Sequence, residues 1–380
     1  MYQSGNGITG RGDCEVMICN VAIIGAGSIG NHLAFSCRKL NWNVDVFDSD
    51  IKALDRFKDD IYPSRYGIFD KEINLKEMNE FRKSNKNSYD VILIGTPPDT
   101  HYSVLVEAVA LKPRVIMIEK PLTGPDSNEI SNIKEIFDSN PEIVFLCGYN
   151  HKVNIATITA EQLINTFIKD GFISLQVHWQ ESWEGILKAH PWLENHNSSY
   201  LGYFERGGGA LFEHSHGLDM WLHFSRILEL GKVDSVSAIA TFEKDEKGNP
   251  QYDSSIVLEL ETTLGFKGKV TQDVTTLPSK KQVEVFTASH RITIGFNDHI
   301  LGDFVLLNEL NSGKEIFNLS AQKTRPFDFD LEIREIERIL HALQEHKFVS
   351  SPLSGALGLE TAQIATASMN SALTGTKIPT

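Results

Sequence analysis

Short apolar runs alternate with stretches of helical periodicity over the first 150 residues. Val16 to Ile24 is mostly apolar and rich in β-branched residues, which predicts a buried strand. A glycine-rich turn follows, and apolar residues at helical spacing then predict a helix ending near Leu40. The alternation continues with predicted strands at 43–47, 91–95, 114–118 and 143–147, and predicted helices at 100–111 and 127–137. This order predicts an α/β fold with a doubly wound parallel sheet of the Rossmann type.

A different pattern begins at Phe172, where apolar and polar positions alternate. The alternation is clearest at 255–262 and predicts strands with one buried and one wetter face. Residues 180–203 are rich in ring side chains and show little periodicity, which is typical of a functional loop. Further strands are predicted at 172–179, 233–242, 266–274, 282–286, 291–295 and 305–309, and helices at 209–230, 331–340 and 355–372. This second half is therefore predicted to be an α+β domain.

The chain length favours two domains, because single hydrophobic cores stop growing below 380 residues. We expect a flexible extension at 1–17, a Rossmann domain at 18–150, and a substrate-binding and oligomerisation domain at 151–380. The last helix of the second domain is a candidate to pack back on the first. An exposed sheet face needs a cover, so a homo-oligomer, a dimer or tetramer, is predicted.

The charge balance narrows the possible partners. The formal net charge is -14, and lysine and arginine form no stripe, which argues against nucleic acid and anionic membrane surfaces. No apolar run approaches the roughly 20 residues that span a bilayer, so a cytoplasmic location is expected. The four cysteines form no CxxC pair, which argues against a metal site or a disulfide framework, and Cys14 and Cys19 are predicted to be free thiols.

A glycine turn between the first strand and the first helix predicts a dinucleotide site. In the run Gly25 to Gly30, Gly25 permits a tight turn, Gly27 allows a pyrophosphate to approach the backbone, and Gly30 permits close helix–strand packing. The helix N-terminus would face the phosphates with its free amides. The predicted cofactor-binding residues here are Gly25, Gly27, Ser28, Ile29 and Gly30.

Asp48 closes the second predicted strand, about 18 residues after the last glycine, where an acid binds the adenosine ribose. Ser49 and Asp50 follow it, with no arginine to receive a 2′-phosphate. The pattern therefore favours NAD over NADP as cofactor. The alternative is that Asp48 is only an acid in the turn after a strand.

Other polar residues stand where later strands of the parallel sheet end, and such ends form the ligand crevice. They are Thr96 and Pro97, Glu119 and Lys120, and Asn150, and all are predicted to face the cofactor. An ammonium beside the nicotinamide could donate a hydrogen bond to the reacting oxygen, which makes Lys120 a candidate catalytic residue. Alternatively, Lys120 is a solvated surface lysine.

The stretch from Gly207 to Asp219 combines three glycines with two carboxylates and two imidazoles. Glycine lets a backbone come close to another molecule, and histidine exchanges protons near neutral pH. This composition predicts a proton-handling site. The alternative is a glycine loop that opens a helix, with Glu213 and Asp219 solvated.

Together these motifs resemble the glucose-fructose oxidoreductase, inositol dehydrogenase and MocA-like family of nicotinamide enzymes, from about Cys19 to the C-terminus. The resemblance implies a Rossmann domain followed by a domain with an open, mostly antiparallel sheet. It implies that Lys120 is the lysine of the family's Glu-Lys-Pro motif, whose lysine–proline bond is often cis.

The same resemblance makes His216 the proton-transferring histidine, because His216 to Asp219 keeps the family's His-x-x-Asp spacing. Glu213 stands where the family usually has an aspartate, and it precedes the histidine by three residues where four is commoner. His214 is a competing candidate for the role of His216. The catalytic set implied is Lys120, His216 and Glu213.

A narrower resemblance links residues 190–200 to the branch of the family found in nonulosonic-acid, amino-sugar and nucleotide-sugar pathways. It implies substrate contacts from His190, Trp192 and Tyr200, although Trp192 and Tyr200 could instead pack the domain. Asp219 is a further predicted substrate-binding residue.

The function predicted from these observations is NAD-dependent oxidation of a ring hydroxyl in a sugar, amino sugar, nucleotide sugar or cyclic polyol. His216 would take the hydroxyl proton, Lys120 would stabilise the oxygen, and Glu213 would orient that pair. Two alternatives stay open at this point. One is a non-catalytic NAD-binding sensor or regulator, and the other is an enzyme that uses NAD for redox-neutral elimination or epimerisation.

Overall fold

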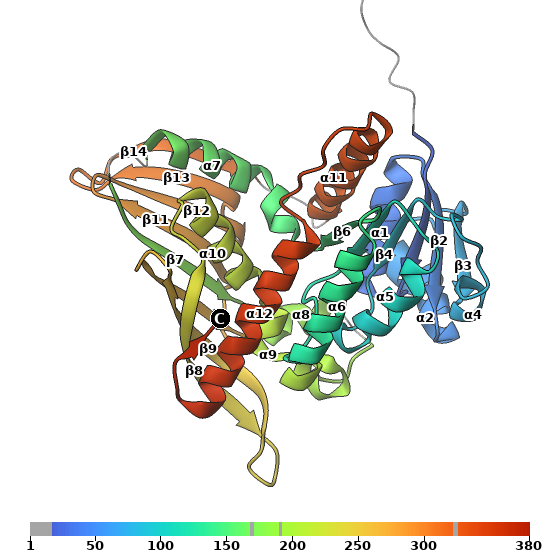
Figure 1. The fold of residues 1–380 in the computed structure, drawn as a ribbon, viewed down its shortest axis with the longest axis horizontal. Coiled ribbons are helices and arrows are strands. Elements are labelled where there is room, and N and C mark those ends of the chain that lie inside the picture. The colour runs from blue at the N-terminus through green and yellow to red at the C-terminus, as the bar shows by residue number, and fades with distance from the viewer. Residues whose placement is uncertain (1–16, 168–170, 190–191, 322–325) are drawn as a thin grey trace, which may run out of the picture.

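Two sheets lie in separate halves of the molecule, with helices between and around them (Figure 1). The computed structural model describes residues 17–167, 171–189, 192–321 and 326–380. The N-terminal half holds a six-stranded sheet, and the other half holds a nine-stranded sheet.

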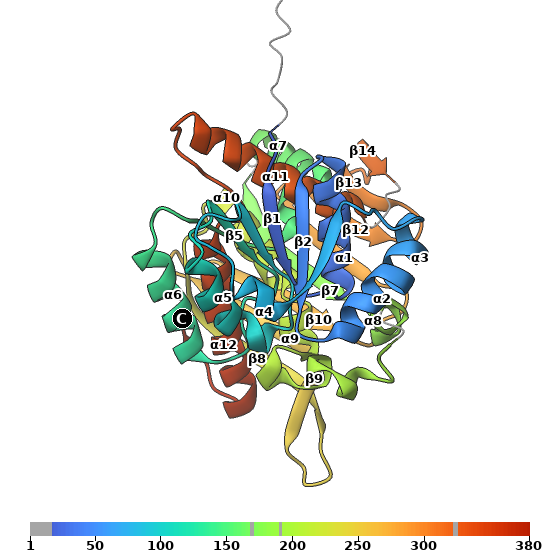
Figure 2. The same ribbon diagram turned by 90° about the vertical axis from the view of Figure 1, so that its right-hand side faces the viewer.

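The first sheet has the order β3-β2-β1-β4-β5-β6, and its strand pairs are all parallel. Its central strands are buried on both faces, which explains their continuous apolar sequences. Figure 2 shows α1, α2 and α3 on one side of this sheet and α5 and α6 on the other. This confirms the predicted doubly wound fold.

The strands of this half are β1 (Asn20–Ile24), β2 (Asn43–Asp48), β3 (Ile73–Glu77), β4 (Val91–Ile94), β5 (Val115–Ile118) and β6 (Val144–Cys147). Its helical elements are α1 (Ser28–Lys39), α2 (Ile51–Arg56), the π-helix η1 (Phe57–Ile61), α3 (Tyr62–Tyr66), α4 (Met78–Phe81), the 3₁₀ turn η2 (Pro98–Thr100), α5 (His101–Val109) and α6 (Ser127–Ser139).

The edge strand β3 was not predicted. Its sequence, Ile73 to Glu77, is largely polar, and only Ile73 is buried. An edge strand with one partner needs little apolar surface, so its hydrophobic pattern is weak. β1 also begins at Asn20, later than the predicted Val16.

The second sheet has the order β14-β13-β12-β11-β7-β10-β9-β8-β15, and only the central β7–β10 pair is parallel. This confirms an open, mostly antiparallel sheet. Helices α7 (Ile155–Phe167) and α10 (His216–Ile227) pack against the apolar residues of one of its faces (Figure 1). The strands are β7 (Phe172–Gln180), β8 (Val233–Lys244), β9 (Pro250–Thr262), β10 (Lys267–Asp273), β11 (Lys280–Thr287), β12 (His290–Asp298), β13 (Gly302–Glu309), β14 (Glu315–Ala321) and β15 (Ile378–Pro379).

The segment 180–203 was predicted as a loop, but its described residues form a helix and two 3₁₀ turns. The helix is α8, and the aromatic rings of the segment pack locally, as where Trp183 stacks on His196 at 5.8 Å between ring centroids. The remaining helical elements of this half are η3 (Asn150–Val153), α7 (Ile155–Phe167), α8 (Trp183–Ala189), η5 (His196–Ser198), η6 (Tyr200–Gly202), η7 (Phe204–Arg206), α9 (Gly209–Glu213), α10 (His216–Ile227), α11 (Pro326–Gln344) and α12 (Gly355–Thr374).

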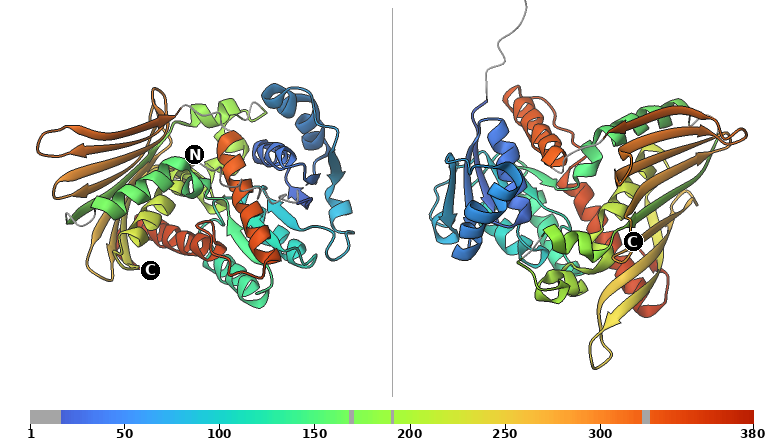
Figure 3. Two further views of the ribbon diagram at one scale, coloured as in Figure 1. Left: turned by 90° about the horizontal axis from the view of Figure 1, so that it is seen from above. Right: turned by 180° about the vertical axis from the view of Figure 1, so that it is seen from behind.

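The last two long helices lie between the two sheets (Figure 3). The apolar face of α11, which includes Phe329, Ile333 and Ile336, packs into the core of the Rossmann half. Helix α12 contacts β6 and α6 of that half and β8 of the other. The limit predicted at residue 150 therefore assigns α11 to the second domain, although its apolar face packs in the core of the Rossmann half.

A buried ion pair ties the segment that follows the parallel sheet to α10. Lys152, in η3, has no exposed side-chain surface, and its Nζ lies 2.9 Å from Oδ1 of Asp219 in α10. The hydroxyl of Thr361, in α12, donates to the same oxygen at 3.1 Å. Removing one partner of such a pair typically costs about 3–5 kcal/mol, because the other charge is left buried and uncompensated. This pair therefore fixes α10 relative to the end of the parallel sheet.

Three of the four cysteines lie in the described part of the chain. Cys19, Cys37 and Cys147 are buried free thiols, and Cys14 lies outside the described residues. Within the described ranges, no cluster of His, Cys, Asp or Glu side chains is arranged to hold a metal ion. Over the same ranges, none of the helices combines the length and the apolar surface needed to cross a membrane.

Candidate active site

The glycine turn after β1 has the backbone geometry of a dinucleotide cradle. Gly25 has φ +110°, and a Cβ there would lie 2.7 Å from the carbonyl oxygen of Gly95. A Cβ on Gly30 would lie 1.9 Å from the carbonyl oxygen of Gly25, so these two positions require glycine. At Gly27, by contrast, a Cβ would meet no atom within 4 Å. The open space in front of Gly27, at the start of α1, fits a pyrophosphate.

Asp48 is held at the glycine turn by two backbone amides. Its Oδ2 accepts a hydrogen bond from the amide of Ala26 at 2.8 Å, and its Oδ1 accepts one from Asp50 at 2.8 Å. The sequence predicted no arginine here, yet the guanidinium of Arg56 reaches Asp50 at 3.4 Å. In the structure the charge of Arg56 is thus paired with the carboxylate of Asp50.

Arg65 is a residue of the glycine turn that the sequence did not reveal. From α3 its guanidinium donates to the carbonyl oxygen of Ser28 at 3.0 Å and to the hydroxyl of Ser28 at 2.8 Å. It brings a positive charge to the first residue of α1, where a pyrophosphate would lie. No local motif marks Arg65, because it lies 37 positions from Ser28 in the sequence.

The residues after β4 and β5 are tied together by a buried histidine. The two ring nitrogens of His101 lie 2.8 Å from the carbonyl oxygen of Thr96 and 3.2 Å from that of Leu122. His101 thus connects the segments that follow these two strands. The peptide bond between Lys120 and Pro121 is cis, as the family resemblance implied.

Glu119 lies beneath Lys120 and is almost completely buried. It is 5% exposed, and a Cβ on Gly148 would lie 2.8 Å from its Oε1, so Gly148 leaves room for this carboxyl group. Burial raises the pKa of Glu119 to about 7, although the charge of Lys120 opposes the shift. Asn150 begins η3 and is also buried.

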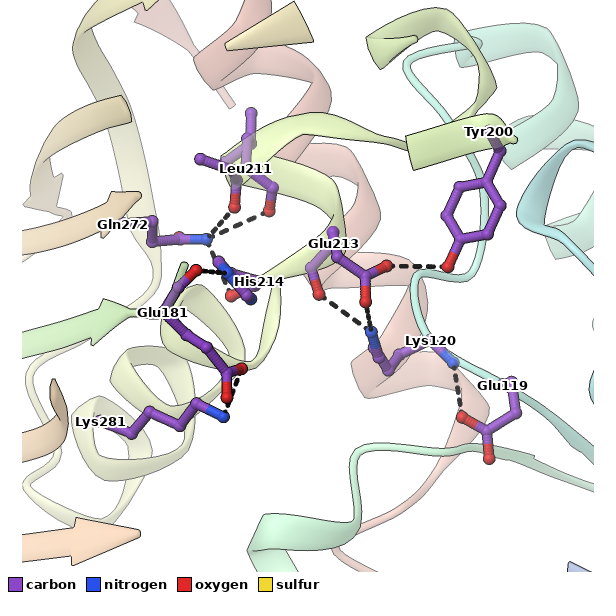
Figure 4. Close-up of polar contacts among 10 residues, drawn as sticks. Glu119, Lys120, Glu181, Tyr200, Leu211, Glu213, His214, Gln272 and Lys281 are labelled. Atoms are coloured by element: carbon purple, nitrogen blue, oxygen red, sulfur yellow. Dashed lines mark hydrogen bonds and ion pairs between the residues drawn. The ribbon is translucent and has the colours of Figure 1, made fainter. Parts of the chain in front are cut away.

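Lys120 reaches across to the second half of the molecule and binds Glu213 twice (Figure 4). Its Nζ donates to the backbone carbonyl oxygen of Glu213 at 2.9 Å and to the Oε1 of the same residue at 3.2 Å. The hydroxyl of Tyr200 donates to Oε2 at 2.9 Å. Burial alone would raise the pKa of Glu213, but the charge of Lys120 and these hydrogen bonds hold it below its ordinary value. Glu213 is therefore an ionised bridge between Lys120 and Tyr200.

The helix predicted at 209–230 is in fact two helices. α9 ends at Glu213 and α10 begins at His216, with His214 and Ser215 between them. The break carries no proline or glycine, so the sequence did not mark it. Its effect is to place Glu213 at one helix end and His216 at the start of the next.

His216 lies among aromatic rings, with centroid distances of 4.6 Å to His151, 5.5 Å to Trp179 and 5.6 Å to Tyr149. Its pKa is lowered well below the ordinary 6.5, first by burial and then by neighbouring positive groups, among them Lys120 and Lys281. The imidazole is therefore neutral at neutral pH and able to accept a proton.

The competing histidine is held in a different way. His214 is 3% exposed, and its Nε2 lies 3.2 Å from the carbonyl oxygen of Glu181. Its own carbonyl oxygen accepts a hydrogen bond from the side-chain amide of Gln272 at 2.8 Å. His214 thus anchors the break between the two helices to the sheet (Figure 4).

The three glycines of this stretch face protein atoms. A Cβ on Gly207 would lie 2.8 Å from the side chain of Pro98, in the first half of the molecule. A Cβ on Gly208 would lie 2.2 Å from the carbonyl oxygen of Tyr200, and one on Gly209 would lie 2.0 Å from the carboxylate of Asp253. The close approach that the glycines allow is therefore to neighbouring backbone, proline and carboxylate groups.

The predicted substrate residues have different fates. Tyr200 binds Glu213, as described above, and Trp192 is half-buried between α8 and η5. His190 lies outside the described residues. The placement of Asp219 is a correction, because its carboxylate is 1% exposed and is bound by Lys152 and Thr361. The prediction missed this pairing because Lys152 is 67 residues away in the sequence.

A comparison with protein families identifies the first half. Residues 19–147 match the model of the oxidoreductase family with an NAD-binding Rossmann fold. This part of the chain is therefore similar to the NAD-binding domains of that family. A search of curated proteins finds no match for the chain. The family resemblance inferred from the motifs is thus confirmed for the NAD-binding domain, and the cofactor is NAD.

Solved structures match over almost the whole chain. Levoglucosan dehydrogenase, in complex with NADH and levoglucosan, matches with a TM-score of 0.72 at 17% identity, over 96% of this chain and 99% of that one. The WlbA dehydrogenase from Bordetella pertussis, with NADH and UDP-GlcNAcA, matches with a TM-score of 0.68 at 16% identity over 96% and 99%. GenD2 from gentamicin A biosynthesis, with NAD, matches with a TM-score of 0.72 at 16% identity over 98% and 99%. At these identities the likeness is one of fold, and it extends from the NAD-binding domain through the second sheet.

The two glycines of the NAD-binding turn make a matched pair for mutation. Gly30→Ala places a methyl group against the carbonyl oxygen of Gly25, so we expect a lower melting temperature together with a loss of NADH binding. Gly27→Ala meets no protein atom within 4 Å, so we expect an unchanged melting temperature and NADH binding weakened by about tenfold or more. Thermal unfolding and NADH fluorescence titration measure the two effects. Normal NADH binding by Gly27→Ala would contradict the placement of the pyrophosphate.

Proposed function

We propose that this protein is an NAD-dependent oxidoreductase that transfers hydride between nicotinamide and a ring hydroxyl or ketone carbon of a sugar or cyclic polyol. The observation that carries the proposal is the meeting of Lys120, from the NAD-binding domain, with Glu213 beside a neutral His216 from the second half. NAD supplies the hydride acceptor when bound. Gly25, Gly27 and Gly30 would hold its pyrophosphate, and Asp48 its adenosine ribose.

Oxidation of a hydroxyl needs a base for the proton and a positive group for the oxygen. His216 is the base in this proposal, because its lowered pKa keeps the imidazole unprotonated. Lys120 donates a hydrogen bond to the oxygen as negative charge develops on it. Glu213 positions the ammonium of Lys120, and Tyr200 positions Glu213. Asp219 is assigned a structural role, in place of substrate contact.

The structural neighbours support a carbohydrate substrate. Two of them are described in complex with levoglucosan and with UDP-GlcNAcA, both of which contain a sugar ring. We extend this class of substrate to the present chain and include amino sugars, nucleotide sugars and cyclic polyols. Trp192 and His190 are proposed as further substrate contacts.

Replacing His216 tests the assignment of the base. We expect His216→Ala to lower kcat with a turned-over sugar by about a hundredfold or more, with NADH binding unchanged, because only the proton acceptor is removed. His214→Gln is the matched variant, since His214 is the neighbouring histidine and is bound to a backbone carbonyl group. It should keep more than a tenth of the activity. Full turnover by His216→Ala at saturating sugar would refute the assignment.

The pH dependence gives an independent test. A base must be unprotonated, so kcat/KM for oxidation falls as the pH drops through the pKa of His216, and this pKa lies well below 6.5. Between pH 6.5 and 8 we therefore expect no loss of rate from titration of this histidine. Lys120→Met removes a charge that lowers this pKa, so the acid limb of its remaining activity should move upward. An acid limb above pH 7 in the unmodified enzyme would contradict this interpretation.

We propose that copies of the protein pair through the outer face of the second sheet. Ile173 in β7 and Ile239 in β8 are 62% and 80% exposed on strands whose inner residues are buried. Burying such side chains between copies removes apolar surface from water. We expect light scattering after gel filtration to give the mass of a dimer or tetramer, and Ile239→Lys to lower it. A monomeric mass for the unmodified protein would exclude this pairing.

A further inference from the structure

A lysine lies on the apolar face of the second sheet, beside the proposed active site. On β11, Lys281 is opposite Trp179 of β7, and the two following pairs on that face join Val283 to Val177 and Val285 to Leu175. All of these partners except Lys281 are fully buried apolar residues. Because side chains alternate along a strand, Lys281 points to the same side as these residues. Its side chain is only 10% exposed.

Lys281 forms an ion pair with Glu181, at 2.6 Å between Nζ and Oε2. The backbone carbonyl group of Glu181 is the partner of His214, and the charge of Lys281 contributes to lowering the pKa of both His214 and His216. The pair therefore lies close to the proton-accepting histidine. Figure 4 shows it on the opposite side of His214 from the pair of Lys120 and Glu213.

A charge on an apolar face is costly, and a packed core would be served as well by an apolar residue. The pair is also not fully enclosed, because the side chain of Glu181 is 28% exposed. An ammonium has three N–H donors and a carboxylate has several acceptor positions, so a single ion pair does not use all of them. Neighbouring hydroxyl groups on a ring match this arrangement, since each can accept from the lysine and donate to the glutamate.

We propose that Lys281 and Glu181 form a substrate-binding subsite that holds two neighbouring hydroxyl groups of an uncharged ring, on carbons other than the one that is oxidised. This inference rests on the proposed function and specifies its substrate class. Each of the two lysines whose charge acts on His216 is paired with a carboxylate, Lys120 with Glu213 and Lys281 with Glu181. A substrate carboxylate at this subsite would lie beside the carboxylate of Glu181 and be repelled by it. The two lysines of these ion pairs would already be paired with carboxylates of the protein. The site therefore favours neutral sugars over uronic acids.

The adjacent lysine supplies a matched control. Lys280 precedes Lys281 on the same strand, pairs with Gln180 and therefore points to the opposite face of the sheet. We compare Lys281→Met and Glu181→Gln with Lys280→Met. Each is assayed for NADH formation with a panel of neutral sugars and cyclic polyols, and with the C6 carboxylates of the same sugars, such as glucose and glucuronate. NADH binding and melting temperature are measured for every variant.

For the best neutral sugar, we expect Lys281→Met to raise KM by about tenfold or more, the effect of losing a hydrogen bond to a charged group, with kcat changed less than threefold. Lys280→Met should match the unmodified enzyme. Glu181→Gln removes the repelling carboxylate, so its kcat/KM ratio of uronate to neutral sugar should rise. If Lys281→Met does not fold, Lys281→Arg is measured in its place, and its KM should stay within about threefold of that of the unmodified enzyme. The subsite is then tested by the uronate ratio of Glu181→Gln.

Three results would overturn the subsite. The first is an equal KM for Lys281→Met and Lys280→Met, and the second is a preference of the unmodified enzyme for the uronate. The third applies if the methionine variant does not fold, and it is an unchanged uronate ratio in Glu181→Gln. Failure of the proposed function looks different. In that case the unmodified protein binds NADH but forms none with any sugar or polyol, and both proposals are lost together.

Discussion

The buried ion pair between Lys152 and Asp219 is the constraint on which the arrangement of the site depends. A charge enclosed in protein is stable only beside its partner, so η3 and α10 can move little relative to one another. η3 follows the last strand of the parallel sheet, and α10 begins with His216. The pair thus holds the histidine of one half at a fixed position relative to the cofactor crevice of the other.

The same fixed relation gives Lys120 two effects in the proposed reaction. Its ammonium lowers the pKa of His216, which keeps the base unprotonated, and it offers a hydrogen bond to the oxygen that the base deprotonates. Glu213 limits the freedom of the lysine side chain and compensates part of its charge. A site that binds a neutral ring is consistent with this balance, because neither ion pair needs a charged ligand to complete it.

Sequence patterns predicted the elements whose signal is local. The run from β1 through Gly30 was recognised because an apolar strand, a glycine turn and a periodic helix follow in order. Features that depend on distant contacts were missed. The carboxylate of Asp219 was assigned to substrate because its lysine partner lies in another element, and the packing of α11 on the first half leaves no mark in its own periodicity.

Lys281 is an intermediate case, because the signal was present but was not used. It precedes the strand predicted at 282–286 by one residue and has the same parity as Val283 and Val285, so a charge stood in line with the apolar positions of that strand. A polar residue on such a face, near a strand end, marks a possible site. The break between α9 and α10 had no comparable mark, since His214 and Ser215 are ordinary helix residues.

The bond from Lys120 to the main-chain carbonyl group of Glu213 has a consequence for how this site can vary among related sequences. Every amino acid supplies that carbonyl group, so part of the lysine's anchorage is independent of the side chain at position 213. A change in the length or spacing of the acid then alters the second contact while the first persists. Selection can therefore exchange aspartate and glutamate at this position, or change the number of residues between the acid and the histidine. In each such sequence the lysine keeps its bond to the main-chain carbonyl group.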